Sequence, residues 1–347
     1  MQPEFYLQKY MQKTLSYNAP ISICVGGNSI GKTYSFTYQG VKEFIDSGKE
    51  FGWIRRYDTE LKKAAGSLFD DLVEHDEFPG YIFKTDKERG YIAKKPKGKA
   101  KPEWQVCCHF FALSKQQTYK GTAYPKVKRL IFDEYIRETK SPPGYLPQDF
   151  EKLMKLWKTI SRKRDDCQLY LLSNAVDLVN PAFLWLGITD EPKPGYSWHN
   201  HKTVLLHHIK DQAFAQSERE TLVGQVIAGT ALEKVMIDNE FAASNDLFIA
   251  KKTPNAKYRY GFKYMNNVYA VWFDLQTGLF YVNRKAPKGA LIYSLTTEDH
   301  RPNMYLVESA GKFARQIGRL YGNGVVRFEN NAAREGFLKM LRMLGLR

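Results

Sequence analysis

Cysteine is scarce in this chain and is absent from the spacings that bind metals. The four cysteines, Cys24, Cys107, Cys108 and Cys167, form no C-x-x-C pattern, so the sequence predicts no zinc site and no disulfide framework. Cys24 and Cys167 lie in or beside apolar strand patterns, where reduced cysteine behaves as a small core residue. This usage indicates a reducing, cytoplasmic compartment.

Long apolar runs are also missing. No stretch approaches the roughly 18 residues of a membrane span, and the start, Met1–Tyr6, lacks the basic and apolar segments of a signal peptide. We therefore expect no membrane association. The 347 residues, 43% of them hydrophobic, are enough for two folded domains of ordinary size.

Acidic residues are few in two segments, although the net charge of the whole chain is only +15. Residues 251–347 hold seventeen Lys and Arg against six Asp and Glu, and residues 84–101 hold eight against two. Segregated positive charge favours a nucleic-acid partner, although a solvated basic surface without a partner is the alternative for both segments. The candidate contacts are Lys94, Lys95, Lys97, Lys99, Lys101, Arg284, Lys285 and Lys288.

Four histidines lie within ten residues, but their pattern predicts no metal site. His199, His201, His207 and His208 have no accompanying cysteine and do not follow the spacing of zinc ligands. We interpret them as surface and strand residues.

One stretch fits G-x-x-x-x-G-K-[ST], the phosphate-binding loop (P-loop) of nucleotide-binding proteins. It consists of Gly26, Gly27, Asn28, Ser29, Ile30, Gly31, Lys32 and Thr33. The glycines allow backbone angles that let successive N–H groups turn inward around phosphate oxygens. Lys32 would reach the outer phosphates of ATP, and the Thr33 hydroxyl would hold Mg²⁺. A chance match in a glycine-rich turn is the alternative.

The context of this loop favours nucleotide binding. An apolar strand is expected at 21–25 and a helix from Thr33 to about Asp46, whose positive N-terminal dipole would face the phosphates. Further strands are expected at 50–55, 128–132 and 168–172, helices at 58–75 and 146–161, and a long hairpin with a lysine-rich tip at 80–111. Alternating strands and helices predict a mostly parallel α/β sheet.

The remainder of the chain has a different pattern after a break at 191–195, where two prolines and a glycine occur. A strand at 203–209 is expected at the rim of the first domain. Strands at 246–251, 257–264, 267–274, 278–283 and 291–295 and helices near 303–321 and 331–345 predict a small α+β domain. We expect an ATPase domain at 1–210, lid or linker helices at 211–245, and a basic nucleic-acid-binding domain at 246–347.

An apolar strand ending in two acids follows the P-loop by about a hundred residues. Asp133 at the end of Leu130–Phe132 would hold the Mg²⁺ of a bound nucleotide, and Glu134 would orient and deprotonate the attacking water. Asp and Glu after a strand can also serve as a cap or turn. Asn174, at the end of the next core strand, would contact the γ-phosphate or the water; an Asx turn is its alternative.

Two groups of arginines leave alternatives open. Arg162–Arg164 end a helix, where cations complement the helix dipole, or one of them acts as an arginine finger in a neighbouring subunit. Arg55 and Arg56 end a strand, where they contact phosphate or form structural ion pairs.

Three strings in order, GGNSIGKT (26–33), RLIFDEYIRE (129–138) and LLSNAVDLVNP (171–181), make the chain similar to a known family. Together with FGWIRRY (51–57), TAYPKV (122–127), AVWFDLQTGLFYV (270–282) and YSLTTEDH (293–300), they resemble the double-stranded-DNA packaging ATPase of small, short-tailed, phi-type phages. The resemblance covers nearly the whole chain. It implies a P-loop ATPase of the RecA-like class with an additional strand and a catalytic glutamate (ASCE).

The resemblance assigns catalytic roles to Lys32, Glu134 and Asn174 and a metal role to Thr33 and Asp133. It favours Arg162 over Arg164 as the trans-acting finger, and it implies Lys120 as a second trans-acting cation. The family can place an arginine inside the P-loop, whereas this chain has Gly27–Ile30 there.

The resemblance also implies a homomeric ring of five subunits on the portal of an empty capsid, tethered by a packaging RNA and acting in the host cytoplasm. Its C-terminal domain resembles a degenerate RNase H-like nuclease. Because the acids of this domain include only Asp274 inside a strand pattern, we expect no cleavage. A terminase-like motor with an active nuclease and a non-hydrolysing nucleic-acid scaffold are the alternative functions.

Overall fold

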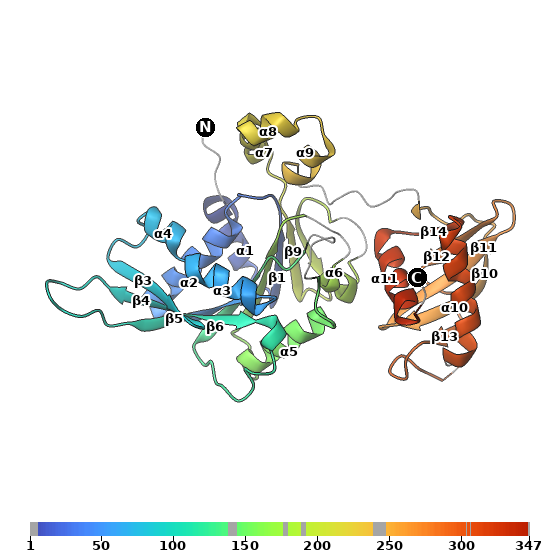
Figure 1. Ribbon diagram of the computed structural model, residues 1–347, viewed down its shortest axis with the longest axis horizontal. Helices are drawn as coiled ribbons and strands as arrows, with labels where there is room; N and C mark the ends of the chain where they lie inside the picture. Colours follow the sequence, from blue (N-terminus) through green and yellow to red (C-terminus); the bar gives the residue numbers. More distant parts are fainter. Residues whose placement is uncertain are drawn as a thin grey trace. The chain divides into compact units, whose positions relative to one another are not determined.

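The computed structural model describes residues 6–137, 144–175, 180–188, 192–238, 248–302, 304–305 and 307–345. Within these ranges the chain forms two compact units (Figure 1), one built from residues up to Leu186 together with 192–238, the other mainly from residues 248–345. Each unit has its own sheet and hydrophobic core. No helix in the described ranges is long and apolar enough to cross a lipid bilayer.

The first unit is organised around a nine-stranded sheet in the order β3-β4-β5-β2-β6-β7-β1-β9-β8. The six strands from β5 to β9 in this order run parallel, whereas β3, β4 and β8 are antiparallel additions at the two edges. β7 lies between β1 and β6, so the strand before the P-loop and the strand before Glu134 are separated by one strand. The strands are β1 (Ile21–Val25), β2 (Glu50–Arg55), β3 (Tyr81–Asp86), β4 (Arg89–Lys94), β5 (Gln105–Ala112), β6 (Val127–Asp133), β7 (Gln168–Ser173), β8 (Gly195–His199) and β9 (Val204–His208).

Helices cover both faces of this sheet. α2 (Lys32–Ser47) contacts β2, β5 and β6, while α5 (Asp149–Ser161) contacts β6 and lies on the other side of the sheet in Figure 1. All five residues of β1 are buried, as expected for a parallel strand covered on both faces. The other helices are α1 (Gln12–Ser16) after a π-helical turn (Leu7–Met11), α3 (Asp58–Ser67), α4 (Asp70–Glu74), α6 (Pro181–Leu186), α7 (Gln212–Glu220), α8 (Leu222–Ile227) and α9 (Ala231–Met236), with a 3₁₀ turn at Leu113–Lys115.

The second unit is a five-stranded sheet in the order β13-β10-β11-β12-β14 with two helices. β10, β11 and β12 form an antiparallel meander, and the short strands β13 and β14 add in parallel at its two edges. Together the two units confirm the predicted fold class, a mostly parallel α/β domain followed by a small α+β domain. The elements are β10 (Lys257–Tyr264), β11 (Asn267–Asp274), β12 (Leu279–Asn283), β13 (Ile292–Ser294), β14 (Val326–Phe328), α10 (Val307–Gly322) and α11 (Asn331–Met343).

Some predicted elements were wrong in detail. The helix expected at 58–75 is two helices, α3 and α4. The segment expected as one long hairpin at 80–111 contains three antiparallel strands, β3, β4 and β5, and its lysine-rich part does connect the antiparallel pair β4 and β5, as expected. The strand at 203–209 is not a rim: β9 pairs with β1 on one side and with β8 on the other. In the segment expected as a strand at 246–251, the described residues make only an isolated bridge at Ile249. The helices before β1 and the strands β8 and β14 were not predicted.

Candidate nucleotide-binding site

The P-loop connects the buried end of β1 to the first turn of α2. Gly31 adopts φ +81°, in the left-handed region that favours glycine, immediately before Lys32 begins the helix. At Gly26, a Cβ atom would lie 2.7 Å from Cβ of Ile209. Because Ile209 Cβ is fixed to its own backbone, no rotamer change relieves this overlap, and only glycine fits. The start of the loop is therefore packed tightly against Ile209, the residue after β9.

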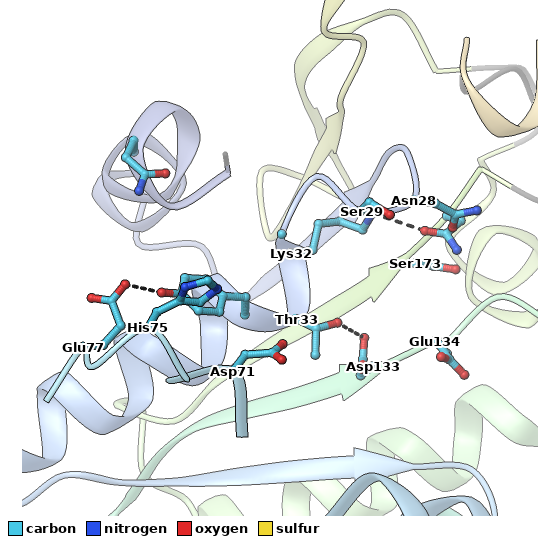
Figure 2. A pocket seen from close by; sticks show the side chains of 14 residues that line it. Asn28, Ser29, Lys32, Thr33, Asp71, His75, Glu77, Asp133, Glu134 and Ser173 are labelled. Carbon is cyan, nitrogen blue, oxygen red and sulfur yellow. Dashed lines mark hydrogen bonds between the residues drawn. The ribbon is translucent and has the colours of Figure 1, made fainter. Parts of the chain in front are cut away.

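A cavity of about 710 Å³ opens beside this loop. Figure 2 shows Lys32 and Thr33 on one side of it with Asp133 and Glu134 close by, while Asp71, His75 and Glu77 lie toward another part of the cavity. The cavity is lined by Gln8, Asn28, Ser29, Gly31, Lys32, Thr33, Tyr34, Asp71, His75, Glu77, Asp133, Glu134, Ser173 and Asn174. The structure thus brings together Lys32, Thr33, Asp133, Glu134 and Asn174, the residues expected to act on one nucleotide.

The ammonium of Lys32 is folded back onto the loop. Its Nζ donates hydrogen bonds to the carbonyl oxygens of Gly26 (3.1 Å) and Gly27 (2.5 Å) and to Oδ1 of Asn174 (3.3 Å). Burial lowers the pKa of Lys32 to about 8, although the nearby Asp133 carboxylate acts in the opposite direction. None of the three oxygen atoms that accept from the Lys32 ammonium carries a negative charge. A bound phosphate would supply that charge.

Thr33 and Asp133 provide two oxygen atoms at the base of the cavity. The Thr33 hydroxyl donates to Oδ1 of Asp133 at 3.2 Å (Figure 2). Burial raises the pKa of Asp133 above its ordinary value, and the guanidinium of Arg55 partly offsets this effect. A hydroxyl and a carboxylate beside a phosphate-binding loop are the donor types that Mg²⁺ prefers, so the residues present fit this ion.

Arg55 bridges both acidic side chains. It contacts Oδ2 of Asp133 at 2.9 Å and Oε2 of Glu134 at 2.5 Å. The Glu134 side chain is 70% exposed, while its backbone adopts φ +54°, a left-handed conformation that costs about 1–3 kcal/mol for a residue other than glycine. Between the alternatives of phosphate contact and ion pairing, this geometry places Arg55 in an ion pair; Arg56 pairs with Asp149.

Arg162 and Lys120 lie together, outside the cavity of their own chain. Both are exposed, and Arg162 donates to the carbonyl oxygen of Thr122 at 2.9 Å, two residues from Lys120. Arg164 has a different role, because its guanidinium donates to five backbone carbonyls of its own chain, which fixes the segment before β6. Of the two arginines, Arg162 is exposed and Arg164 is partly buried.

Six residues of the cavity were missed by sequence reasoning. Tyr34 is the residue after Thr33 and could have been found from its place on α2; its hydroxyl donates to Glu77, and its ring lies 5.9 Å from that of His75. Gln8 lies in the π-helical turn, Ser173 ends β7, and Asp71, His75 and Glu77 lie in or just after α4. No local pattern indicates that these three segments share a site.

The basic residues expected to contact nucleic acid differ in their surroundings. Arg284 contacts the Asn267 side chain and lies 5.8 Å from the Tyr269 ring, so it is held within the second unit. The others, Lys94, Lys95, Lys97, Lys99, Lys101, Lys285 and Lys288, are exposed.

Neither acids nor histidines form a second metal centre in the part of the chain that the structure describes. No group of three His, Cys, Asp or Glu side chains there could hold a metal ion. Asp274 instead accepts hydrogen bonds from Thr253 Oγ1 and from the N–H groups of Gln276 and Thr277, as in a turn after a strand. His207 and His208 are buried strand residues, and His201 is exposed.

These features define a P-loop nucleotide-binding protein of the α/β class: the loop between β1 and α2, the inserted strand β7, and the two acids at the end of β6. Residues 4–344 match the model of the podovirus DNA encapsidation protein (Gp16), and the chain belongs to this family.

Similar proteins cover the whole chain. A DNA packaging protein of Bacillus phage B103 is 34% identical over 333 residues, which are 94% of this chain and 99% of that protein. A solved chain of the bacteriophage Phi-29 viral genome packaging motor assembly superposes with a TM-score of 0.73 at 29% identity, covering 99% of this chain and 100% of that one. A chain of the Phi-28 gp11 DNA packaging motor shares the fold, with a TM-score of 0.65 at 18% identity over 97% of both chains.

Proposed function

We propose that this protein hydrolyses ATP to move double-stranded DNA into a preformed capsid. The observation that carries the proposal is the convergence of Lys32, Thr33, Asp133 and Glu134 on one cavity, in a chain of the DNA encapsidation family. Proteins similar to this chain over its full length are named as DNA packaging proteins or belong to a packaging motor assembly.

The chemistry follows from the placement of each side chain. Lys32, released from the loop carbonyls, neutralises the outer phosphates, and Thr33 and Asp133 hold Mg²⁺. A bound Mg²⁺ would supply positive charge that offsets the negative charge developing on the phosphates. Glu134 accepts a proton from the attacking water, and Asn174, already hydrogen-bonded to Lys32, orients groups at the γ-phosphate.

The position of Arg162 and Lys120 supports the proposal of a ring. Both lie outside the cavity of their own chain, so they act on a nucleotide only if a neighbouring subunit presents its cavity to them. We propose a homomeric ring, of five subunits by family resemblance, on the portal of a procapsid in the host cytoplasm and tethered by a packaging RNA. The exposed lysines of 94–101 and Lys285 and Lys288 grip the DNA backbone, which is the same for every sequence.

The test is steady-state ATP hydrolysis with and without double-stranded DNA, for the wild type, Glu134→Gln and Arg162→Ala. Lys163→Ala, which removes the neighbouring exposed cation, is the matched control. We expect DNA-stimulated turnover to be lost in the first two variants, kept in the control, and restored when the two inactive variants are mixed. Full activity of Arg162→Ala would exclude the finger, and no turnover even on assembled procapsids with DNA would favour a non-hydrolysing scaffold.

A further inference from the structure

The end of β2 and the residue after it carry two arginines with different partners. Arg55 contacts the side chains of Asp133 and Glu134, whereas Arg56 is buried, only 1% exposed, and donates from Nε to Oδ2 of Asp149 at 2.6 Å. The guanidinium carbon of Arg56 lies 5.1 Å from the ring centre of Phe132 and 4.9 Å from that of Tyr145. A buried charge held this closely has few alternative arrangements.

Arg56 also holds the backbone that carries the catalytic carboxylate. It donates to the carbonyl oxygens of Tyr135 (2.6 Å) and Glu134 (3.4 Å). Glu134 has a left-handed backbone, φ +54°, and such a conformation persists only where the surroundings impose it. These two hydrogen bonds contribute to that constraint and connect the backbone of Glu134 to the guanidinium of Arg56.

Asp149 extends the connection to another element. It is the first residue of α5, and its Oδ2 also accepts from the N–H of Leu146 at 3.1 Å. The thirteen residues of α5 end at Ser161, where Arg162 caps the helix with φ +45°. Leu153, Leu156 and Ile160 are buried along one face of the helix. One end of a rigid helix is thus tied to the Glu134 backbone, and the other end carries Arg162.

We propose that Arg56 and Asp149 are positioning residues that couple the catalytic carboxylate of a subunit to the arginine which that subunit offers to its neighbour. The inference rests on the proposed ring mechanism. A change at Glu134, such as its release from Arg55, moves the Tyr135 carbonyl, Arg56 and Asp149, and α5 carries this displacement to Arg162. Each site then reports its state to the next site through one buried ion pair.

The test uses Arg56→Lys, which keeps the charge but cannot reach the carboxylate and both carbonyls, and Asp149→Asn, which removes the charge with little change of shape. We expect both variants to bind ATP within about threefold of the wild type while kcat falls roughly tenfold or more. A loss confined to KM would overturn the proposal, because a positioning role acts on turnover.

Mixed rings separate coupling from a local role. A variant that affects only Glu134 still offers a normal Arg162, so mixing it with Arg162→Ala subunits restores turnover. A variant that affects only Arg162 still has a normal Glu134, so mixing it with Glu134→Gln subunits restores turnover. We expect Arg56→Lys to be rescued by neither, because both ends of the connection are displaced. Rescue by either partner would overturn the coupling. If Glu134→Gln and Arg162→Ala do not rescue each other, the ring mechanism itself fails, and this inference fails with it.

Arg129→Lys is the matched control for the loss of a buried arginine. Arg129 is also buried, pairs with Glu43 at 2.5 Å and lies 4.6 Å from the Tyr170 ring, at the end of β6 remote from Asp133. We expect Arg129→Lys to lower the melting temperature as Arg56→Lys does but to keep normal turnover. If Arg129→Lys loses activity in the same way, general destabilisation explains the result and the proposal is wrong. If Arg56→Lys does not fold, Asp149→Asn decides.

Discussion

Arg55 and Glu134 form an ion pair of 2.5 Å at the edge of the nucleotide cavity. The same guanidinium contacts Asp133 at 2.9 Å, so one cation pairs with both of the acids to which we assign the metal and the catalytic role. Oε2 of Glu134 accepts from the guanidinium, so this oxygen is not available to accept from a water molecule. We therefore interpret the pair as a resting arrangement, in which Glu134 must leave Arg55 before it can act on water.

Replacement of Arg55 is expected to remove this restraint. In Arg55→Gln we expect ATP hydrolysis without DNA to rise roughly tenfold, the size of one charged hydrogen bond, while stimulation by DNA falls. Arg55→Lys, which keeps the charge, is the control and should retain most of the stimulation. The measurement is steady-state turnover with and without DNA. Lower turnover of Arg55→Gln under both conditions would show that Arg55 instead supports the chemical step.

The local part of this site is predictable from sequence, and the contacts across the fold are not. Lys32 and Thr33 belong to one contiguous motif, and Asp133 and Glu134 follow an apolar strand, so short patterns identify them. The pairing of Arg55 with Glu134 requires β2 and β6 to be neighbours in the sheet. His75 reaches the cavity because the predicted single helix is broken before α4. Neither the Arg55–Glu134 pair nor the position of His75 produces a periodic pattern in the sequence.

The strands also divide into those with a clear local pattern and those that depend on contacts across the fold. β2, β10 and β11 have the bounds expected from their sequences, because strands of this length with apolar residues carry a clear pattern. β8 was missed since it is a half-exposed edge strand directly after a proline-rich break. β14, which is as short as β13, was missed in a segment between two helices, α10 and α11. Their pairing with neighbouring strands, rather than their own composition, determines that they are strands.

The affinity for ATP should depend on pH through Lys32. Its pKa is about 8 in the nucleotide-free protein, and the negative charge of the phosphates raises it in the complex. The affinity should therefore be constant below pH 8 and fall about tenfold per pH unit above it, as the free protein loses the proton. Equilibrium binding of a fluorescent ATP analogue from pH 7 to 9.5 measures this. Lys32→Gln should bind weakly without that dependence, and an unchanged affinity of the wild type up to pH 9.5 would contradict the assignment.

His207 should make the first unit sensitive to acid. Its ring is buried, stacked 3.9 Å from the Tyr196 ring, with Nδ1 3.4 Å from the Tyr6 hydroxyl. Burial lowers its pKa to about 3, below the unfolded value of about 6.5. The unfolded state therefore binds the proton first, and stability is present above pH 6.5 and lost as the pH falls toward 3.

This pH dependence can be isolated by substitution. Between pH 6.5 and 5, His207 should account for about 2 kcal/mol of lost unfolding free energy, and His207→Gln should lack this component. His201→Gln, at an exposed position, is the control and should behave like the wild type. Denaturant unfolding at pH 7.5 and pH 5 measures the difference. Equal losses in His207→Gln and the wild type would assign the acid sensitivity to other groups.

The basic segments should differ in the salt dependence of DNA binding. Each lysine that contacts a phosphate contributes about 0.9 to the slope of log affinity against log salt concentration. Lys285→Ala/Lys288→Ala should therefore reduce the magnitude of the slope by about 1.8. Arg284→Ala should leave it nearly unchanged, because its guanidinium contacts Asn267 and lies near the Tyr269 ring. The measurement is binding of a short duplex over a series of salt concentrations.

The lysines at 94–101 provide the sharper comparison, since five exposed cations lie at the end of β4 and in the connection that follows it. If all five contact phosphates, their replacement by alanine lowers the slope by about 4.5, whereas removal of non-specific surface charge lowers it far less. The double variant Lys155→Ala/Lys158→Ala on α5 removes two exposed cations outside both segments, and it is the control for the double variant Lys285→Ala/Lys288→Ala. If the slope falls equally in these two double variants, binding depends on total charge. A slope that depends on position would instead identify the surface along which the duplex lies.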